Sequence, residues 1–136
     1  MEKSDGKAGQ VRVLVFCESR YPVSRRLIKK KIEEVLAKQE LSGPVEVSVA
    51  IVGNRKMKTL NKKYREQDVP TDVLSFLILE GKPTVLPQDG VFRLGDVVIS
   101  YPLAVANAAK KEIMVNEEIS NLLEHGLRNL LEMSND

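Results

Sequence analysis

The run VFRLGDVVIS, residues Val91–Ser100, is the point at which the character of the chain changes. Its β-branched and apolar residues predict a strand. Gly95 interrupts the run, and a glycine inside a strand often marks a β-bulge or a close approach of another backbone. Beyond Pro102 the residues predict two helical pieces, PLAVANAAKKE and NEEISNLLEHGLRNLLE. The strand therefore joins an all-helical end to a part in which strands and helices alternate.

Three further runs upstream predict strands. They are VRVLVFCE (Val11–Glu18), VEVSVAIV (Val45–Val52) and TDVLSFLILE (Thr71–Glu80). The first two alternate between inward and outward positions, which is typical of half-buried strands. The third is apolar on both faces, which favours a central strand covered on both sides.

Helices are predicted between these strands. SRRLIKKKIEEVLAKQE begins with Ser24 as an N-cap and repeats apolar residues at helical spacing. In GNRKMKTLNKKYREQDVP, Asn54 is a candidate cap for a short helix, and Pro70 ends the segment. The stretch GKPTVLPQDG, residues 81–90, contains two glycines and two prolines and is interpreted as a loop.

The order β-α-β-α-β-β-α-α predicts an α+β protein with one small mixed four-stranded sheet and about four helices. A length of 136 residues fits one domain. Residues 1–10 are polar and contain glycine, so we expect a disordered tail followed by a single domain over residues 11–136.

Composition limits the function classes. A net charge of +2 is too small to indicate nucleic-acid binding by itself. The sequence has no run of 18 apolar residues and no apolar signal core at its start, so we expect a cytoplasmic protein without a membrane partner. Cys17, the sole cysteine, has no base placed beside it and is interpreted as a packed strand residue.

Three stretches together resemble one family. They are LNKKYREQDVPTDVLSF (residues 60–76), LGDVVIS (residues 94–100) and HGLRNLLEMSN (residues 125–135). The family is the bacterial YbeY type, an rRNA maturation factor described as a single-strand-specific, zinc-dependent endoribonuclease. The first two stretches match its blocks closely, and the third falls where its three-histidine metal signature belongs. The resemblance implies an α+β fold and a role in rRNA processing.

The metal signature is incomplete in this chain. The resemblance places its three histidines at His125, Asn129 and Asn135, and its glycine at Glu132. Residues four apart on a helix share a face, but a ligand six residues further on returns to that face only if the helix stops. Glutamate is a poor helix stop, and asparagine amides are weak substitutes for imidazole at a zinc ion. We therefore expect zinc to bind weakly or not at all.

The resemblance also implies that Arg65 lies in the cleft near the metal and contacts RNA phosphate. Guanidinium suits that role because it can grip a phosphate with two parallel hydrogen bonds. Arg65 and His125 are the candidate catalytic residues. Lys62, Lys63 and Arg65 are the candidate RNA-binding residues, since a basic cluster beside the cleft can follow a phosphate backbone. Alternatively, these charged side chains only form a helix face that is exposed to solvent. Aromatic residues are scarce, so little base stacking is expected.

Two functions remain open at this point. The first is a metal-dependent single-strand endoribonuclease in rRNA processing with an impaired metal site. The second is a non-catalytic RNA- or ribosome-binding factor that keeps the fold and the basic cleft. Both imply rRNA or other single-stranded RNA as a partner, and the ribosomal small subunit or its proteins as further candidates.

Overall fold

The computed structural model describes residues 11–39, 44–77 and 90–134. Their elements are, in chain order, β1 (Val11–Cys17), α2 (Arg25–Ala37), β2 (Val45–Val52), α3 (Asn54–Arg65), β3 (Val73–Leu77), β4 (Phe92–Ser100), α4 (Tyr101–Lys111) and α5 (Val115–Ser134). The predicted α+β class, mixed sheet and number of helices are confirmed. The expected tail at residues 1–10 and nearly all of the expected loop lie outside the described residues.

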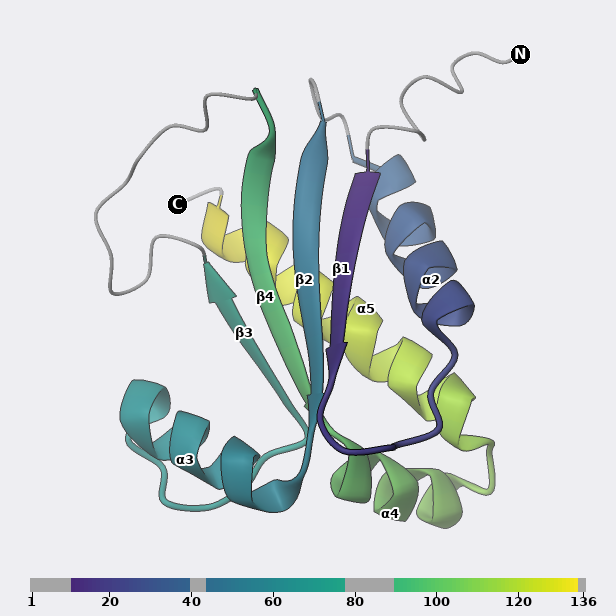
Figure 1. Ribbon diagram of the computed structural model, residues 1–136, viewed down its shortest axis with the longest axis vertical. Helices are drawn as coiled ribbons and strands as arrows, with labels where there is room; N and C mark the ends of the chain where they lie inside the picture. The colour runs from purple at the N-terminus through teal and green to yellow at the C-terminus, as the bar shows by residue number, and fades with distance from the viewer. Residues whose placement is uncertain (1–10, 40–43, 78–89, 135–136) are drawn as a thin grey trace.

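One sheet contains all four of these strands in the order β1-β2-β4-β3 (Figure 1). β2 lies parallel to β1 and to β4, while β3 lies antiparallel to β4. The prediction that the third strand is central was therefore wrong, because β3 forms an edge. Its apolar character has another cause: Leu74 and Phe76 are buried on one side, and Ser75 is buried on the side that faces α5.

Gly95 marks a β-bulge in β4, as the sequence indicated. Arg93 lies opposite Glu46, but Gly95 lies opposite Val47, so one residue of β4 is extra. The backbone of Gly95 has φ +152, and a Cβ there would lie 2.2 Å from the carbonyl oxygen of Phe76. The position therefore needs glycine both for its conformation and for the close approach of β3.

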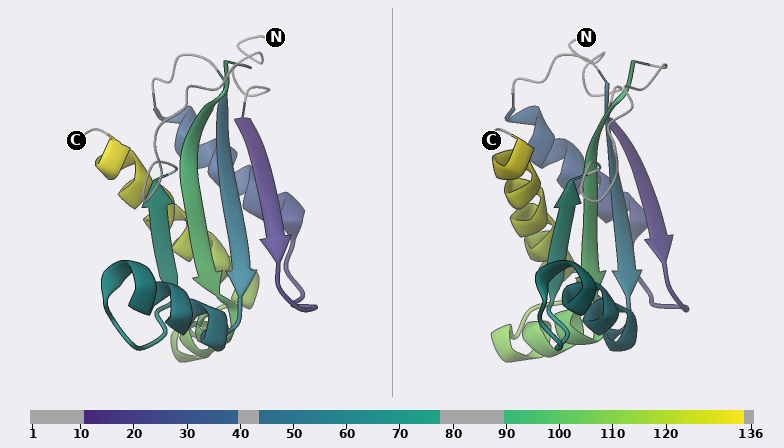
Figure 2. Two further views of the ribbon diagram at one scale, coloured as in Figure 1. Left: turned by 60° about the vertical axis from the view of Figure 1, so that its left-hand side comes forward. Right: turned by 90° about the vertical axis from the view of Figure 1, so that its left-hand side faces the viewer.

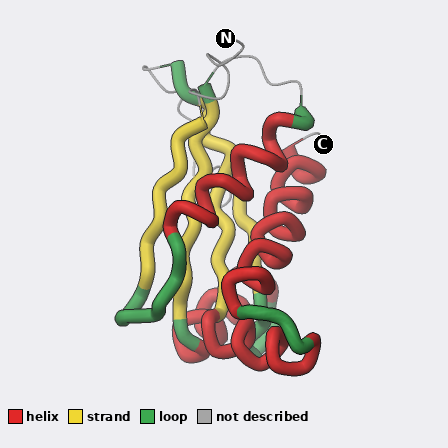
Figure 3. Tube along the Cα trace, turned by 90° about the vertical axis from the view of Figure 1, so that its right-hand side faces the viewer, coloured by secondary structure: helices red, strands yellow, loops and turns green. Residues whose placement is uncertain are grey.

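Helices α2 and α5 cover the same face of the sheet, as the two turned views make clear (Figure 2, Figure 3). The main core lies between them and the strands. Its fully buried members include Ile28 and Ile32 of α2, Val47 of β2, and Leu123 and Leu127 of α5. α5 packs against α2, α4, β3 and β4, so this helix ties the other layers together.

Helix α3 lies on the opposite face and covers only one end of it (Figure 1). A second, smaller core holds it there through Met57 of α3 against Val98 of β4 and Phe76 of β3. Ser24 caps α2 as predicted, accepting a hydrogen bond from the N–H of Leu27 at 3.2 Å. The predicted cap at Asn54 was wrong.

Gly53 occupies the N-cap position of α3 and makes no side-chain cap bond. Asn54 is instead the first helical residue, and its amide oxygen accepts a hydrogen bond from the Ser100 hydroxyl at 2.8 Å. This bond joins the start of α3 to the end of β4. Among the described helices, none combines the length and the hydropathy that crossing a membrane requires.

Candidate functional site

Helix α5 carries two of the candidate site residues away from the core. His125 is exposed and Asn129 is half-buried, while Gly126, Leu127 and Leu130 between and beyond them are buried. A spacing of four residues places His125 and Asn129 on the same side of the helix, as expected. α5 runs through Glu132 to Ser134 without a break, and Asn135 lies outside the described residues.

Gly126 brings this part of α5 close to the sheet. A Cβ at this position would lie 2.6 Å from Cγ1 of Val97 and 3.2 Å from Oγ of Ser75. The Ser75 hydroxyl uses the close approach to donate a hydrogen bond to the carbonyl oxygen of Gly126 at 2.8 Å. Edge strand β3 and the helix segment beside His125 are therefore held together by packing and by a buried hydrogen bond.

Arg65 is held against the same strand from the other side. It is the last residue of α3, after which Glu66 adopts a left-handed conformation with φ 58 and ends the helix. Nη2 of Arg65 donates to the carbonyl oxygen of Ser75 at 2.7 Å, and its guanidinium lies 5.0 Å from the centre of the Phe76 ring. Two hydrogen bonds thus lead from Arg65 through Ser75 to Gly126, the neighbour of His125.

The other basic candidates lie on the outer side of α3. Lys62 and Lys63 are exposed, and both line a shallow depression with Arg55, Lys58, Thr59 and Asp68. Asp68 lies 4.0 Å from the ammonium groups of Lys58 and Lys62, and exposed pairs at such a distance contribute little. Arg65 faces the β3 edge, whereas the lysines face solvent, so the cluster forms two adjoining surfaces.

Glu118 is a buried carboxylate that the sequence patterns did not single out, and it lies beside the start of β3. Glu118 of α5 has 1% of its side chain exposed. It accepts hydrogen bonds from Lys111 at 2.8 Å, from Asn121 at 3.2 Å and from Asn107 at 3.3 Å. Asn107 also donates to Asp72, which directly precedes β3, at 3.1 Å. The sequence indicates this buried position, because Glu118 lies at helical spacing among the apolar residues of α5.

The charge state of Glu118 follows from these contacts. Burial acts to raise the pKa of its carboxyl, but hydrogen bonds from Lys111, Asn121 and Asn107 and the positive charge of Lys111 hold that pKa below its usual value. Glu118 is therefore ionised at neutral pH, and its charge is compensated inside the protein. Its hydrogen bonds link α4 to α5 and, through Asn107 and Asp72, to the start of β3.

Within the described residues, the side chains near His125 do not make up the ligand set of a catalytic zinc site. Such a site needs about three protein ligands from His, Asp, Glu or Cys and one open position. Over residues 11–39, 44–77 and 90–134, no three side chains of these types are grouped so that they could hold a metal ion. His125 provides one imidazole and Asn129 a neutral amide on the same side of α5. How strongly the whole chain binds zinc stays a prediction.

The fold and the residues at the β3 edge define a class of protein. It is an α+β protein whose main helical layer, α2 and α5, covers one face of the sheet, and whose edge strand β3 is joined by hydrogen bonds to α3 on one side and to α5 on the other. A model of the family described as Endoribonuclease YbeY matches residues 17–132. The chain therefore belongs to the Endoribonuclease YbeY family.

Individual relatives agree with this placement. An Endoribonuclease YbeY of Dehalococcoides mccartyi is 38% identical over 130 residues, covering 90% of this chain and 81% of the relative. One of Roseiflexus castenholzii is 36% identical over 109 residues, covering 80% of this chain and 69% of the relative. The solution structure of TM1509 from Thermotoga maritima matches with a TM-score of 0.55 and 27% identity, covering 87% of this chain and 71% of that one.

Proposed function

We propose that the protein acts on single-stranded RNA in rRNA maturation, as an endoribonuclease whose metal site is impaired. Its relatives carry the name Endoribonuclease YbeY, and the family implies an RNA substrate. The observation that carries the proposal is the anchoring of Arg65 through Ser75 to the α5 segment beside His125. A guanidinium fixed at this edge can hold an RNA phosphate by two parallel hydrogen bonds. Such a role places the protein in the cytoplasm with the ribosomal small subunit or its proteins as partners.

Lys62 and Lys63 supply the second part of the proposed RNA surface. Each phosphate contact on a single strand contributes about 0.7 to the slope of log affinity against log salt. Replacing both lysines by alanine should therefore lower the slope by about 1.4, measured by fluorescence anisotropy with a short single-stranded RNA. The matched control is Lys29→Ala with Lys30→Ala, because these exposed residues of α2 remove the same charge elsewhere. An equal change in the two double variants would place the RNA surface elsewhere.

A non-catalytic RNA- or ribosome-binding factor is the second candidate function. One observation favours it, namely the absence of three grouped His, Cys, Asp or Glu side chains in the described parts of the chain. Cleavage of a labelled single strand, with and without a chelator, separates the two functions. Residual cleavage that the chelator removes supports the impaired enzyme. Tight RNA binding with the same cleavage as a protein-free control supports the binding factor.

A further inference from the structure

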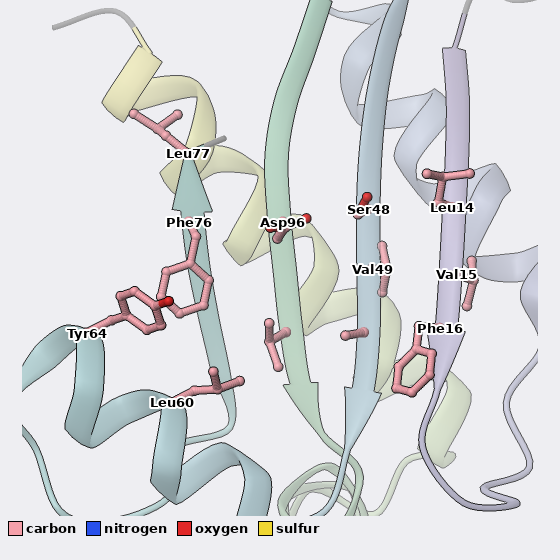
Figure 4. A pocket seen from close by; sticks show the side chains of 12 residues that line it. Leu14, Val15, Phe16, Ser48, Val49, Leu60, Tyr64, Phe76, Leu77 and Asp96 are labelled. Atoms are coloured by element: carbon pink, nitrogen blue, oxygen red, sulfur yellow. The ribbon is translucent and has the colours of Figure 1, made fainter. Parts of the chain in front are cut away.

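The sheet face opposite α2 and α5 carries an open apolar groove (Figure 4). Its volume is about 520 Å³. Its floor comes from β2 and β4, one wall from Leu14 and Phe16 of β1, and the other from Phe76 of β3 with Leu60 and Tyr64 of α3. Among the described helices, α3 covers this face, and only at one end.

Aromatic rings stand on both walls of the groove. Phe16 is 63% exposed, which is unusual for a phenylalanine inside a strand. Across the groove, Tyr64 and Phe76 pack edge to face with their ring centres 4.9 Å apart. Figure 4 shows Phe16 on one side and this pair on the other, with Ser48 and Asp96 between them. Two ring-bearing walls around a partly polar floor suit a flat ligand with polar edges.

The charge around the groove is positive at two of its boundaries. α3 contributes Leu60 and Tyr64 to the wall, and the same helix contains six cationic residues and no acidic one. At the far end of the face, Glu46 pairs with Arg12 at 3.2 Å and with Arg93 at 3.3 Å. One carboxylate between two guanidinium groups leaves this triad with a net positive charge. Asp96 contributes a carboxyl group to the floor, so the groove suits a ligand whose flat part enters between the rings while its anionic groups stay at the cationic boundaries.

We propose that the groove binds bases of single-stranded RNA, which stack against Phe16 and Tyr64 while the phosphates follow the lysines of α3. This inference rests on the proposed function, because it names a second contact of the same RNA. Stacking tolerates any base, since every base presents a π face, so the groove strengthens binding without selecting sequence. The rings on opposite walls favour RNA over the other anionic occupant that fits the charge, an acidic amphipathic helix of a protein.

The test compares two RNAs with the same phosphates. One is a short single strand of uridines, and the other has the same length but carries abasic riboses. Wild-type protein should bind the strand with bases about fivefold to a hundredfold more tightly, the range that a stacked base gives. Phe16→Ala should lower this ratio, because one of the two stacking rings is lost, and leave the affinity for the abasic strand unchanged. Its exposed ring makes the substitution safe for folding, which a thermal melt verifies.

The matched control is Phe92→Ala. Phe92 is 50% exposed on β4 and does not line the groove, so its removal should leave the ratio unchanged. Equal binding of both strands by the wild type would overturn the inference but leave the proposed function standing. Failure to bind either strand would overturn the proposed function and, with it, the inference. An acidic amphipathic peptide that binds only when Phe16 is present, together with equal binding of the two RNAs, would assign the groove to a protein partner instead.

Discussion

Replacement of Glu118 by glutamine should destabilise the protein by about 2 kcal/mol. Glu118 is buried and accepts its shortest hydrogen bond, at 2.8 Å, from the ammonium group of Lys111. Bonds to charged groups contribute about 1.5–3 kcal/mol, and removing one partner of a fully buried ion pair costs about 3–5 kcal/mol. Lys111 has 52% of its side chain exposed and can recover water, which favours the lower range. Glutamine also places its N–H₂ group, which is itself a donor, against at least one of the donors that the carboxylate accepted from, so that hydrogen bond is lost.

Urea unfolding followed by far-ultraviolet circular dichroism measures this change. The midpoint should fall with an unchanged m value, and the melting temperature should drop by about 4–8 °C. Glu117→Gln is the matched control, because Glu117 is the neighbouring residue on α5 and is exposed. Its effect should stay within about 0.5 kcal/mol. Similar losses in the two variants would refute the idea that the buried carboxylate supports α4, α5 and β3.

Lowering the pH should narrow the difference in the free energy of unfolding between the wild type and Glu118→Gln. The pKa of Glu118 is lowered in the folded protein, so its contribution is complete above the unfolded value of 4.5 and is lost as the pH falls through the folded value. Glutamine does not titrate, and the two unfolding curves should therefore approach each other at acid pH. A difference that grows below pH 4.5 would contradict this sign.

Two further changes test other parts of the account. Gly95→Ala should cost at least about 3 kcal/mol in urea unfolding, because a Cβ would clash with Phe76 and the positive φ adds strain; a stable, fully folded variant would contradict the bulge geometry. Arg128 and Lys31 lower the pKa of Glu124 to about 2, so its contribution is lost between pH 4.5 and 2. Glu124→Gln should therefore reduce the loss of stability in acid by less than about 1 kcal/mol, since solvent screens this surface group. An unchanged dependence of stability on pH would show that these ion pairs do not contribute.

Local signals in the sequence predicted most of the elements. The alternation of Val45–Val52 gave the bounds of β2, Ser24 gave the start of α2, and Gly95 gave the bulge. Each depends on residues close together in the chain, and the structure confirmed each one. The order of the strands does not depend on such local features. The apolar run of Val73–Leu77 has the same pattern at an edge covered by α3 and α5 as it would have in the centre of a sheet.

The candidate site shows the same division. Spacing along α5 predicted that His125 and Asn129 share a side, which is a property of any helix. The hydrogen bonds from Arg65 to Ser75 and from Ser75 to Gly126 join residues 10 and 51 positions apart, so no local pattern could predict them. The expectation of little stacking rested on the small number of aromatic residues. It did not foresee that Phe16, Tyr64 and Phe76 gather around one groove.

The zinc content of the purified protein tests the impaired metal site most directly. We predict far less than one zinc ion per molecule, because His125 alone cannot hold the ion. The matched variant combines Asn129→His, Glu132→Gly and Asn135→His, which restores three imidazoles and gives α5, now continuous to Ser134, a place to end. It should bind one zinc ion per molecule. Stoichiometric zinc in the unchanged chain would contradict the account.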